Sequence, residues 1–173
     1  MARTNVKRTT ITYNAAISAC AKGGQPLVAL ELLADMAGAQ VQVDVITCNA
    51  AVSACEKGGK SNVALGLLGE MVEARVAKDT ITCNAAITAC EKGGDWPMAI
   101  ALFNTMAEES IQRSAVTYNA VIRACSNRGK WVWALEFLRA MIDARVEVDS
   151  YAWSAAADAC YRGGQWWITL GLL

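Results

Sequence analysis

One short segment recurs along the whole chain at a constant spacing, and this repetition limits the fold more than any other feature. In its second copy the segment is TCNAAVSACEKGG, at residues 47–59. The copies occupy residues 12–24, 47–59, 82–94, 117–129 and 152–164, so that successive copies start 35 residues apart without insertion or deletion. A fixed period of this length is typical of solenoid proteins, whose repeats pack mainly against their neighbours.

The period divides the chain into repeat units that form a single continuous domain. The complete units are residues 10–44, 45–79, 80–114 and 115–149. Residues 1–9 align with the tail of a preceding unit, and residues 150–173 align with the start of a fifth. We therefore expect the chain to be a fragment of a longer array.

Each unit is predicted to contain two helices. The first is expected to begin at the threonine that opens each copy, because its hydroxyl can accept a free backbone N–H, and to end at glycines such as Gly23 and Gly24. Pro26 and Pro97 fall in the first turn of the second helix. Apolar residues then recur every three or four positions, which is the helical spacing.

Columns of alanine are expected to let these helices approach closely. They are Ala19, Ala54, Ala89, Ala124 and Ala159 on the first helix, and Ala29, Ala64, Ala99 and Ala134 on the second. The sequence thus predicts an all-α fold, a right-handed α-solenoid superhelix of 35-residue helix-turn-helix repeats with a concave face.

Composition excludes several classes of function. Lys plus Arg and Asp plus Glu both number 16, so the chain lacks the excess positive charge of many nucleic-acid-binding proteins. There is no His and no Cys-x-x-Cys pair, which removes the commonest general base and the usual zinc motifs. No apolar run is long enough to span a membrane. We therefore expect no enzyme activity, cofactor, metal site, small-molecule substrate or membrane association.

The seven cysteines lie in two columns and are predicted to be core residues. The main column is Cys20, Cys55, Cys90, Cys125 and Cys160, and the second is Cys48 and Cys83. Packed helices lie roughly 8–10 Å apart, whereas a disulfide needs Cα atoms closer than about 7 Å. Small buried thiols are therefore favoured over a redox or metal role.

Trp96, Trp131 and Trp166 share a position at the start of the second helix. Packing over the turn between the helices is the favoured interpretation, and an exposed row that docks a protein partner is the alternative.

Three further columns are the strongest candidates for a binding site. Asparagine stands in the first turn of the first helix at Asn14, Asn49, Asn84 and Asn119, and Ser154 replaces it in the fifth unit. A polar residue closes each unit, at Asp44, Asp79, Ser114 and Asp149. An apolar residue stands three positions before each of these four asparagines and before Ser154, at Ile11, Ile46, Ile81, Val116 and Tyr151. One such asparagine is explained as a local cap, but four at one position indicate a repeated recognition element whose amide pairs with the polar edge of a base.

These units resemble pentatricopeptide repeats (PPR), the organellar RNA-binding solenoids, of the P type. The resemblance rests on the 35-residue length, the Thr12-Tyr13-Asn14 opening, the Lys-Gly-Gly turn, the Ala-Leu-x-Leu-Leu-x-x-Met second helix and the closing Asp. It covers nearly the whole chain. Tetratricopeptide units differ in length, at about 34 residues, and in aromatic pattern.

The resemblance implies that each repeat binds one base of single-stranded RNA. The asparagine and unit-closing columns would select the base, and the apolar row would sandwich it. Three Asn–Asp pairs then imply uridine, and Asn84 with Ser114 implies a pyrimidine, with cytidine preferred. Ser154 has no closing partner, and guanosine is the expected base there. The implied ligand is 5′-U-U-C-U-(G)-3′.

The family also places a cation near the phosphates at the end of the first helix. Lys22, Lys57, Lys92 and Arg162 occupy this position, whereas Asn127 interrupts the column with Arg128 beside it. Solvated cations that favour the negative end of the helix dipole are an equally good explanation.

Two functional hypotheses follow. The first is a sequence-selective RNA-binding adapter in organellar RNA processing, stability, splicing, editing or translation, with RNA-processing proteins as further partners. By resemblance its location would be the chloroplast or mitochondrion, although no transit peptide is visible in this sequence. The second is a helical-repeat scaffold for protein partners, which the zero net charge and the tryptophan column favour.

Overall fold

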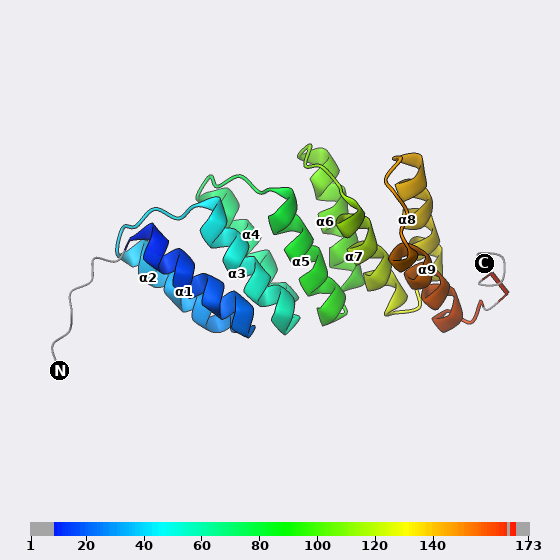
Figure 1. Cartoon of the computed structure of the whole chain (residues 1–173), viewed down its shortest axis with the longest axis horizontal. Helices are drawn as coiled ribbons and strands as arrows, with labels where there is room; N and C mark the ends of the chain where they lie inside the picture. The colour runs from blue at the N-terminus through cyan, green and yellow to red at the C-terminus, as the bar shows by residue number, and fades with distance from the viewer. Residues whose placement is uncertain (1–8, 166, 169–173) are drawn as a thin grey trace.

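The structure is a computed structural model that describes residues 9–165, 167 and 168. The described residues form helices that follow one another along the long axis of the molecule (Figure 1). The helices are α1 (Thr10–Gly23), α2 (Pro26–Gly38), α3 (Val45–Gly58), α4 (Ser61–Glu73), α5 (Thr80–Gly93), α6 (Trp96–Glu108), α7 (Ala115–Ser126), α8 (Trp131–Asp143) and α9 (Ser150–Arg162). The predicted all-α repeat solenoid is confirmed.

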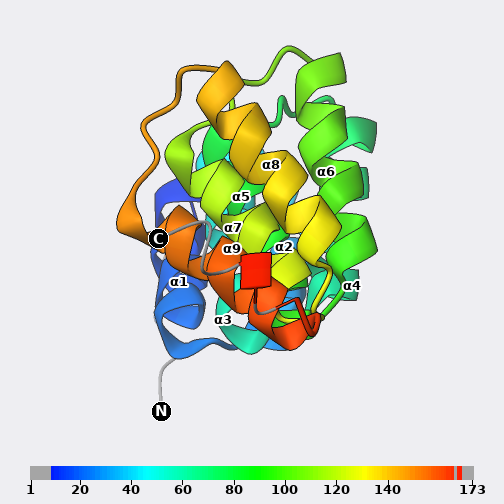
Figure 2. The same ribbon diagram turned by 90° about the vertical axis from the view of Figure 1, so that its right-hand side faces the viewer.

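The helices form two layers. Each odd-numbered helix packs against the next odd-numbered helix, and the even-numbered helices lie in a second layer across from them (Figures 1 and 2). Among the described residues, contacts of comparable extent do not join neighbouring even-numbered helices. Closer spacing in one layer curves a stack toward that layer, so the odd-numbered helices form the inner side. The odd-numbered helices begin at the first residue of each unit drawn from the sequence, but the unit boundaries themselves stay a prediction.

The predicted helix starts were two to three residues late. The threonines Thr47, Thr82 and Thr117 do not cap their helices from outside but lie at the third helical position. The N-cap is the residue that closes the preceding unit, as where Asp44 accepts the backbone N–H of Thr47 at 2.8 Å. The threonine hydroxyl completes a capping box with the N-cap backbone. The helix begins at the earlier position because the Asp44 carboxylate, three residues before Thr47, already accepts a free backbone N–H of the first turn.

The predicted glycine stops are confirmed for α1, α3 and α5, as at Gly24, which adopts a left-handed conformation with φ of 61° and whose backbone N–H bonds to Ala21. The stop predicted at Gly129 is wrong, because α7 already ends at Ser126 with Asn127 as its C-cap. The second helices end differently. Gln40, Arg75, Ser110 and Arg145 follow them and carry positive φ angles of 54° to 57°. These non-glycine residues are held there by bonds such as Val76 N–H to the Met71 carbonyl, at 2.8 Å.

The core lies between the two layers. Cys55, Cys90, Cys125 and Cys160 are fully buried free thiols, which confirms their prediction as core residues. Burial raises the pKa of Cys55 to about 11 and that of Cys90 to about 12, so these thiols stay protonated and unreactive at neutral pH. The alanine columns are buried as predicted, except that Ala19 is exposed because no described helix precedes α1.

The described residues contain no group of three or more His, Cys, Asp or Glu side chains placed to hold a metal ion. None of the described helices combines the length and apolarity needed to cross a membrane.

Candidate nucleic-acid interface

The asparagine column and the unit-closing column meet in space on the inner side of the array. Each asparagine is the fifth residue of an odd-numbered helix, one turn later than predicted because the helices begin earlier, and its partner is the N-cap of the next odd-numbered helix. The amide nitrogen Nδ2 donates to the partner in all four pairs: Asn14 to Asp44 at 3.4 Å, Asn49 to Asp79 at 3.0 Å, Asn84 to Ser114 at 3.5 Å and Asn119 to Asp149 at 2.9 Å. Residues 30 positions apart in the sequence therefore form one polar pair per repeat. Ser154 is exposed, and its counterpart would follow Leu173.

A third residue joins three of these pairs, and the sequence analysis missed it. The hydroxyl of Thr117 donates to Asn84 Oδ1 at 2.7 Å. Thr47 and Thr82 make the same bond to Asn14 and Asn49. The threonine recurs in the sequence two residues before an asparagine of the column, at Thr47, Thr82 and Thr117. We had assigned these threonines to helix capping alone.

The unit-closing carboxylates are ionised at neutral pH. Burial alone would raise the pKa of Asp44 and Asp79, but hydrogen bonds from Thr47 and Asn14 to the first, and from Thr82 and Asn49 to the second, outweigh it and lower both pKa values. The backbone N–H of Ala152 is the main cause of the lowered pKa of Asp149. Each carboxylate is therefore a hydrogen-bond acceptor only, and it would repel a phosphate rather than bind one.

The apolar row is exposed, as its predicted role requires. Ile11 is 80% exposed and Val116, the most covered of the five, is still 59% exposed. Each residue is the second of its odd-numbered helix and lies three positions before an asparagine, or before Ser154 in the fifth repeat, so that both share one helix face. Exposed apolar side chains at one position in every repeat would be buried by a ligand that runs along the array.

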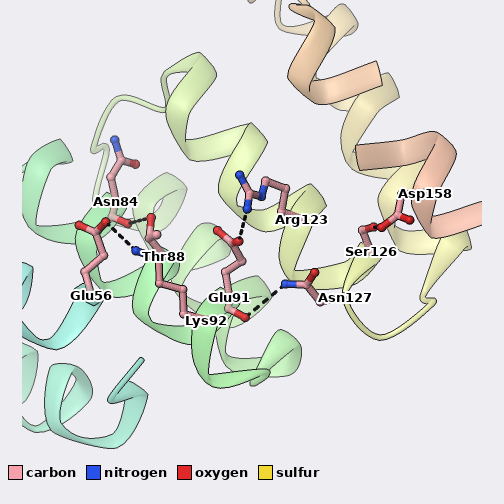
Figure 3. A network of polar contacts seen from close by, with 9 residues as sticks. All are labelled: Glu56, Asn84, Thr88, Glu91, Lys92, Arg123, Ser126, Asn127 and Asp158. Atoms are coloured by element: carbon pink, nitrogen blue, oxygen red, sulfur yellow. Dashed lines mark hydrogen bonds and ion pairs between the residues drawn. The ribbon is translucent and has the colours of Figure 1, made fainter. Parts of the chain in front are cut away.

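The predicted phosphate-contacting cations are already partnered to different degrees. Lys57 Nζ donates to the Lys22 carbonyl at the end of α1, at 3.0 Å, as expected for a cation at a helix C-terminus. Lys92 pairs with Glu56 at 3.3 Å (Figure 3), and Arg162 pairs with Asp158 at 2.7 Å. These exposed pairs are weak and exchangeable. Lys22 is exposed.

A hollow of about 430 Å³ between α1 and α3 brings the predicted rows together. Its walls include Asn49 and Ile46, together with the cations Lys22 and Lys57. One member of the asparagine column, one of the apolar row and two of the cation column therefore face a common space. The rest of the wall consists of Ser18, Ala21, Ala50, Ser53 and the acid Glu56.

The tryptophan column packs as predicted where it is described. Trp131 lies so close to Gly163 that a Cβ there would collide with its ring, so it covers the turn of the following repeat. Trp96 is half-buried, and Lys130 Nζ lies 5.3 Å from the centroid of its ring. Trp166 lies outside the described residues.

Paired helices at a fixed period, with one polar pair per repeat on the inner side, define a helical-repeat protein of the α-solenoid class. Matches to known protein families identify which kind of solenoid this is. The sequence profile of the pentatricopeptide repeat domain matches residues 31–78 and 67–128, and that of the PPR repeat matches residues 11–41 and 116–146. The chain belongs to the pentatricopeptide repeat family.

Solved structures share this fold. The pentatricopeptide repeat protein PPR10, in complex with an 18-nt psaJ RNA element, has a TM-score of 0.87 at 22% sequence identity and matches 98% of this chain. The match covers 25% of that chain. The PPR domain of Arabidopsis thaliana protein-only RNase P 1, in complex with tRNA, has a TM-score of 0.75 at 18% identity, over 91% of this chain and 84% of that one. Comparison with curated protein sequences gives no significant match.

Proposed function

We propose that the chain binds single-stranded RNA with one base per repeat. The observation that carries this proposal is the set of four polar pairs, each formed by an asparagine and the next N-cap residue at the same place in successive repeats. The exposed apolar row beside the pairs supplies one stacking surface per base. Similarity to PPR10 and to the RNase P domain, whose structures contain RNA, supports the same ligand class.

The chemistry of each pair favours a pyrimidine. At the first three pairs a threonine hydroxyl approaches the asparagine oxygen, which leaves an amide N–H as the group available to a ligand. An N–H donor complements the carbonyl oxygens of uridine or cytidine. The neighbouring carboxylate of Asp79 only accepts, so it complements the N3–H of uridine and opposes the N3 lone pair of cytidine.

Ser114 changes this selection because a hydroxyl both donates and accepts. At the third repeat the pair formed by Asn84 and Ser114 can therefore serve the N3 acceptor of cytidine. This chemistry agrees with the order 5′-U-U-C-U-3′ for the first four repeats, and guanosine at the fifth rests on the family resemblance alone. In this proposal the chain is a non-catalytic adapter that acts with other RNA-processing proteins in a chloroplast or mitochondrion.

The test is direct measurement of RNA affinity. Fluorescence anisotropy with an oligonucleotide that contains UUCUG, and with its single-base variants, should show the tightest binding to the parent sequence and a penalty for each purine at the first four positions. Equal affinity for all variants, or no binding, would contradict the proposal.

The charge distribution favours a second candidate, a scaffold for protein partners. The net charge is zero, and Lys57, Lys92 and Arg162 are paired with a carbonyl or with acids, which weakens any attraction to a phosphate backbone. A selection from random-sequence RNA at two salt concentrations separates the two, because RNA binding loses affinity as salt rises. Enrichment of no sequence at either concentration would favour the scaffold.

A further inference from the structure

The first three asparagines of the inner side are held at both ends of the amide. In the second pair, Asn49 Nδ2 donates to Asp79, and the hydroxyl of Thr82 donates to Asn49 Oδ1. The same hydroxyl lies 2.8 Å from Asp79 Oδ1, so its single proton is shared between two acceptor oxygens, one on each member of the pair. When both the nitrogen and the oxygen of the amide are hydrogen-bonded, the amide group cannot rotate freely. Its remaining N–H then points in one direction.

The fourth asparagine is held at one end only. Asn119 Nδ2 donates to Asp149 at 2.9 Å, but Ala152 stands where the earlier repeats have threonine. Asn119 Oδ1 is buried and has no hydrogen-bond partner among the described residues. A buried acceptor without a partner is unfavourable, so the amide gains by turning about its contact with Asp149. The donor that it offers to a base then has no fixed direction.

We propose that the threonine hydroxyl is a positioning group for base selection and that the fourth repeat, which lacks it, selects its base less strictly than the first three. This inference rests on the proposed RNA-binding function. It concerns Thr47, Thr82 and Thr117, which touch no base in this scheme and act through the asparagine beside them.

Apart from the missing hydroxyl, the contact between the fourth and fifth repeats, which we call the fourth junction, has the same local fold as the earlier ones. The backbone N–H of Ala152 donates to Asp149 Oδ1 at 2.9 Å, as the N–H of Thr82 does to Asp79 Oδ1 at 2.8 Å. The helix cap is therefore present without the hydroxyl. Threonine is fully buried at the equivalent position of the three preceding junctions, which shows that the repeat accommodates it there.

The experiment inserts the missing hydroxyl. Discrimination is measured as the ratio of Kd values for RNA with cytidine and with uridine at one position, for the full chain. We expect the wild-type ratio at the fourth base to be about fivefold lower than at the second, as one hydrogen bond would give. Ala152→Thr should raise the fourth ratio by about fivefold and leave the second unchanged. Ala152→Val, which adds similar volume without a hydroxyl, should not raise it.

The reverse variants separate positioning from structural support. Thr82→Val should lower the ratio at the second base to the wild-type value of the fourth, and Thr82→Ser should restore it. A uniform loss of affinity for both bases, with an unchanged ratio, would show that the hydroxyl only supports the fold and would overturn the inference. Equal wild-type ratios at the second and fourth bases would overturn it as well.

A measurement without RNA keeps this inference distinct from the proposed function. Side-chain ¹⁵N relaxation should give a high order parameter for the Asn49 amide and a lower one for Asn119, and Ala152→Thr should raise the latter. Equal order parameters would overturn the inference while leaving RNA binding untouched. Failure of the wild-type chain to bind any RNA would overturn the proposed function and this inference with it.

Discussion

The two halves of the array share one fold but differ in how completely their helix junctions are filled. In the N-terminal half, Leu33, Cys48 and Leu67 line a hollow of about 520 Å³ between α2 and α4. In the C-terminal half the residues 70 positions later are aromatic. They are Phe103, Tyr118 and Phe137. The Phe103 ring lies 5.1 Å from that of Tyr118 and 5.0 Å from that of Phe137, in edge-to-face contact.

The inner side shows the same difference. Ser53 lines the open hollow between α1 and α3, whereas its equivalent in the fourth repeat is Arg123, which pairs with Glu91 at 3.0 Å (Figure 3). Glu91 is only 5% exposed, while the equivalent Glu56 is half-buried and pairs with Lys92. Both halves keep an N-cap residue that pairs with an asparagine, while the residues beside these pairs decide how much space a ligand finds.

Removal of Arg123 should have the largest effect on stability. Arg123→Ala leaves the buried Glu91 carboxylate without its partner, and we expect a loss of about 2–3 kcal/mol in the free energy of unfolding at neutral pH. The matched change Lys92→Ala breaks the exposed pair with Glu56 and should cost about 1 kcal/mol or less. Urea denaturation measures both. Equal losses would contradict the distinction between the two halves.

The pH dependence of the stability loss in Arg123→Ala tests whether the buried Glu91 carboxylate is its cause. Burial raises the pKa of Glu91 above 4.5, although Arg123 opposes the shift. A raised folded-state pKa means that this carboxyl favours folding when protonated, and that its contribution is lost as pH rises through the folded-state value. Without Arg123 the pKa rises further, so the penalty of Arg123→Ala should shrink between pH 7.5 and pH 5. A penalty that grows on acidification would contradict this account.

A change at the second base-selecting pair should have the next largest effect. Asn49→Thr replaces the amide donor with a hydroxyl, and we expect preference at the second base to move from uridine toward a purine, by about tenfold in relative Kd, or about 1.4 kcal/mol. The preferences at the other positions should not change. Binding assays with single-base RNA variants measure the shift, and an unchanged profile at the second base would remove the assignment of this column.

How much of this site the sequence predicts depends on the kind of contact. The 35-residue period and the glycine stops predict the solenoid, because they act within a repeat or between identical neighbours. The pairing of Asn49 with Asp79 also follows from the columns, once a family resemblance is stated. The capping role of Asp44 was missed because a hydroxyl at Thr47 looked sufficient. The pair of Glu91 with Arg123 was missed because it occurs at one junction and leaves no periodic signal.

Filling the hollow of about 520 Å³ between α2 and α4 should make the packing of the N-terminal half resemble that of the C-terminal half. Tyr13 Oη donates to Asp35 at 2.8 Å, and Glu70 is the equivalent acceptor for a tyrosine at position 48. Cys48→Tyr should therefore raise the free energy of unfolding by about 1 kcal/mol. The control is Cys83→Tyr, which enters the packed cluster around Phe103 and should destabilise the chain. Thermal unfolding of both variants checks the opposite signs, and stabilisation by both would contradict the difference.

The turns after the second helices should show the smallest effect and no difference between the halves. Arg75 and Arg145 both have a φ of 55°, where a side chain is strained. Arg75→Gly and Arg145→Gly should each raise the free energy of unfolding by about 0.5 kcal/mol, since the strain relieved exceeds the added freedom of the unfolded chain. Clearly unequal values in denaturant titrations would show that the halves differ at these turns too.

The most direct test of the central claim exchanges the closing residues of two adjacent repeats. Asp79 and Ser114 both cap the following helix, so Asp79→Ser and Ser114→Asp preserve the fold while reversing the predicted bases. RNA-binding measurements on the double variant should show preference for cytidine at the second base and uridine at the third, the reverse of the wild-type chain. Unchanged preferences in a folded double variant would contradict the claim that these pairs face the bases.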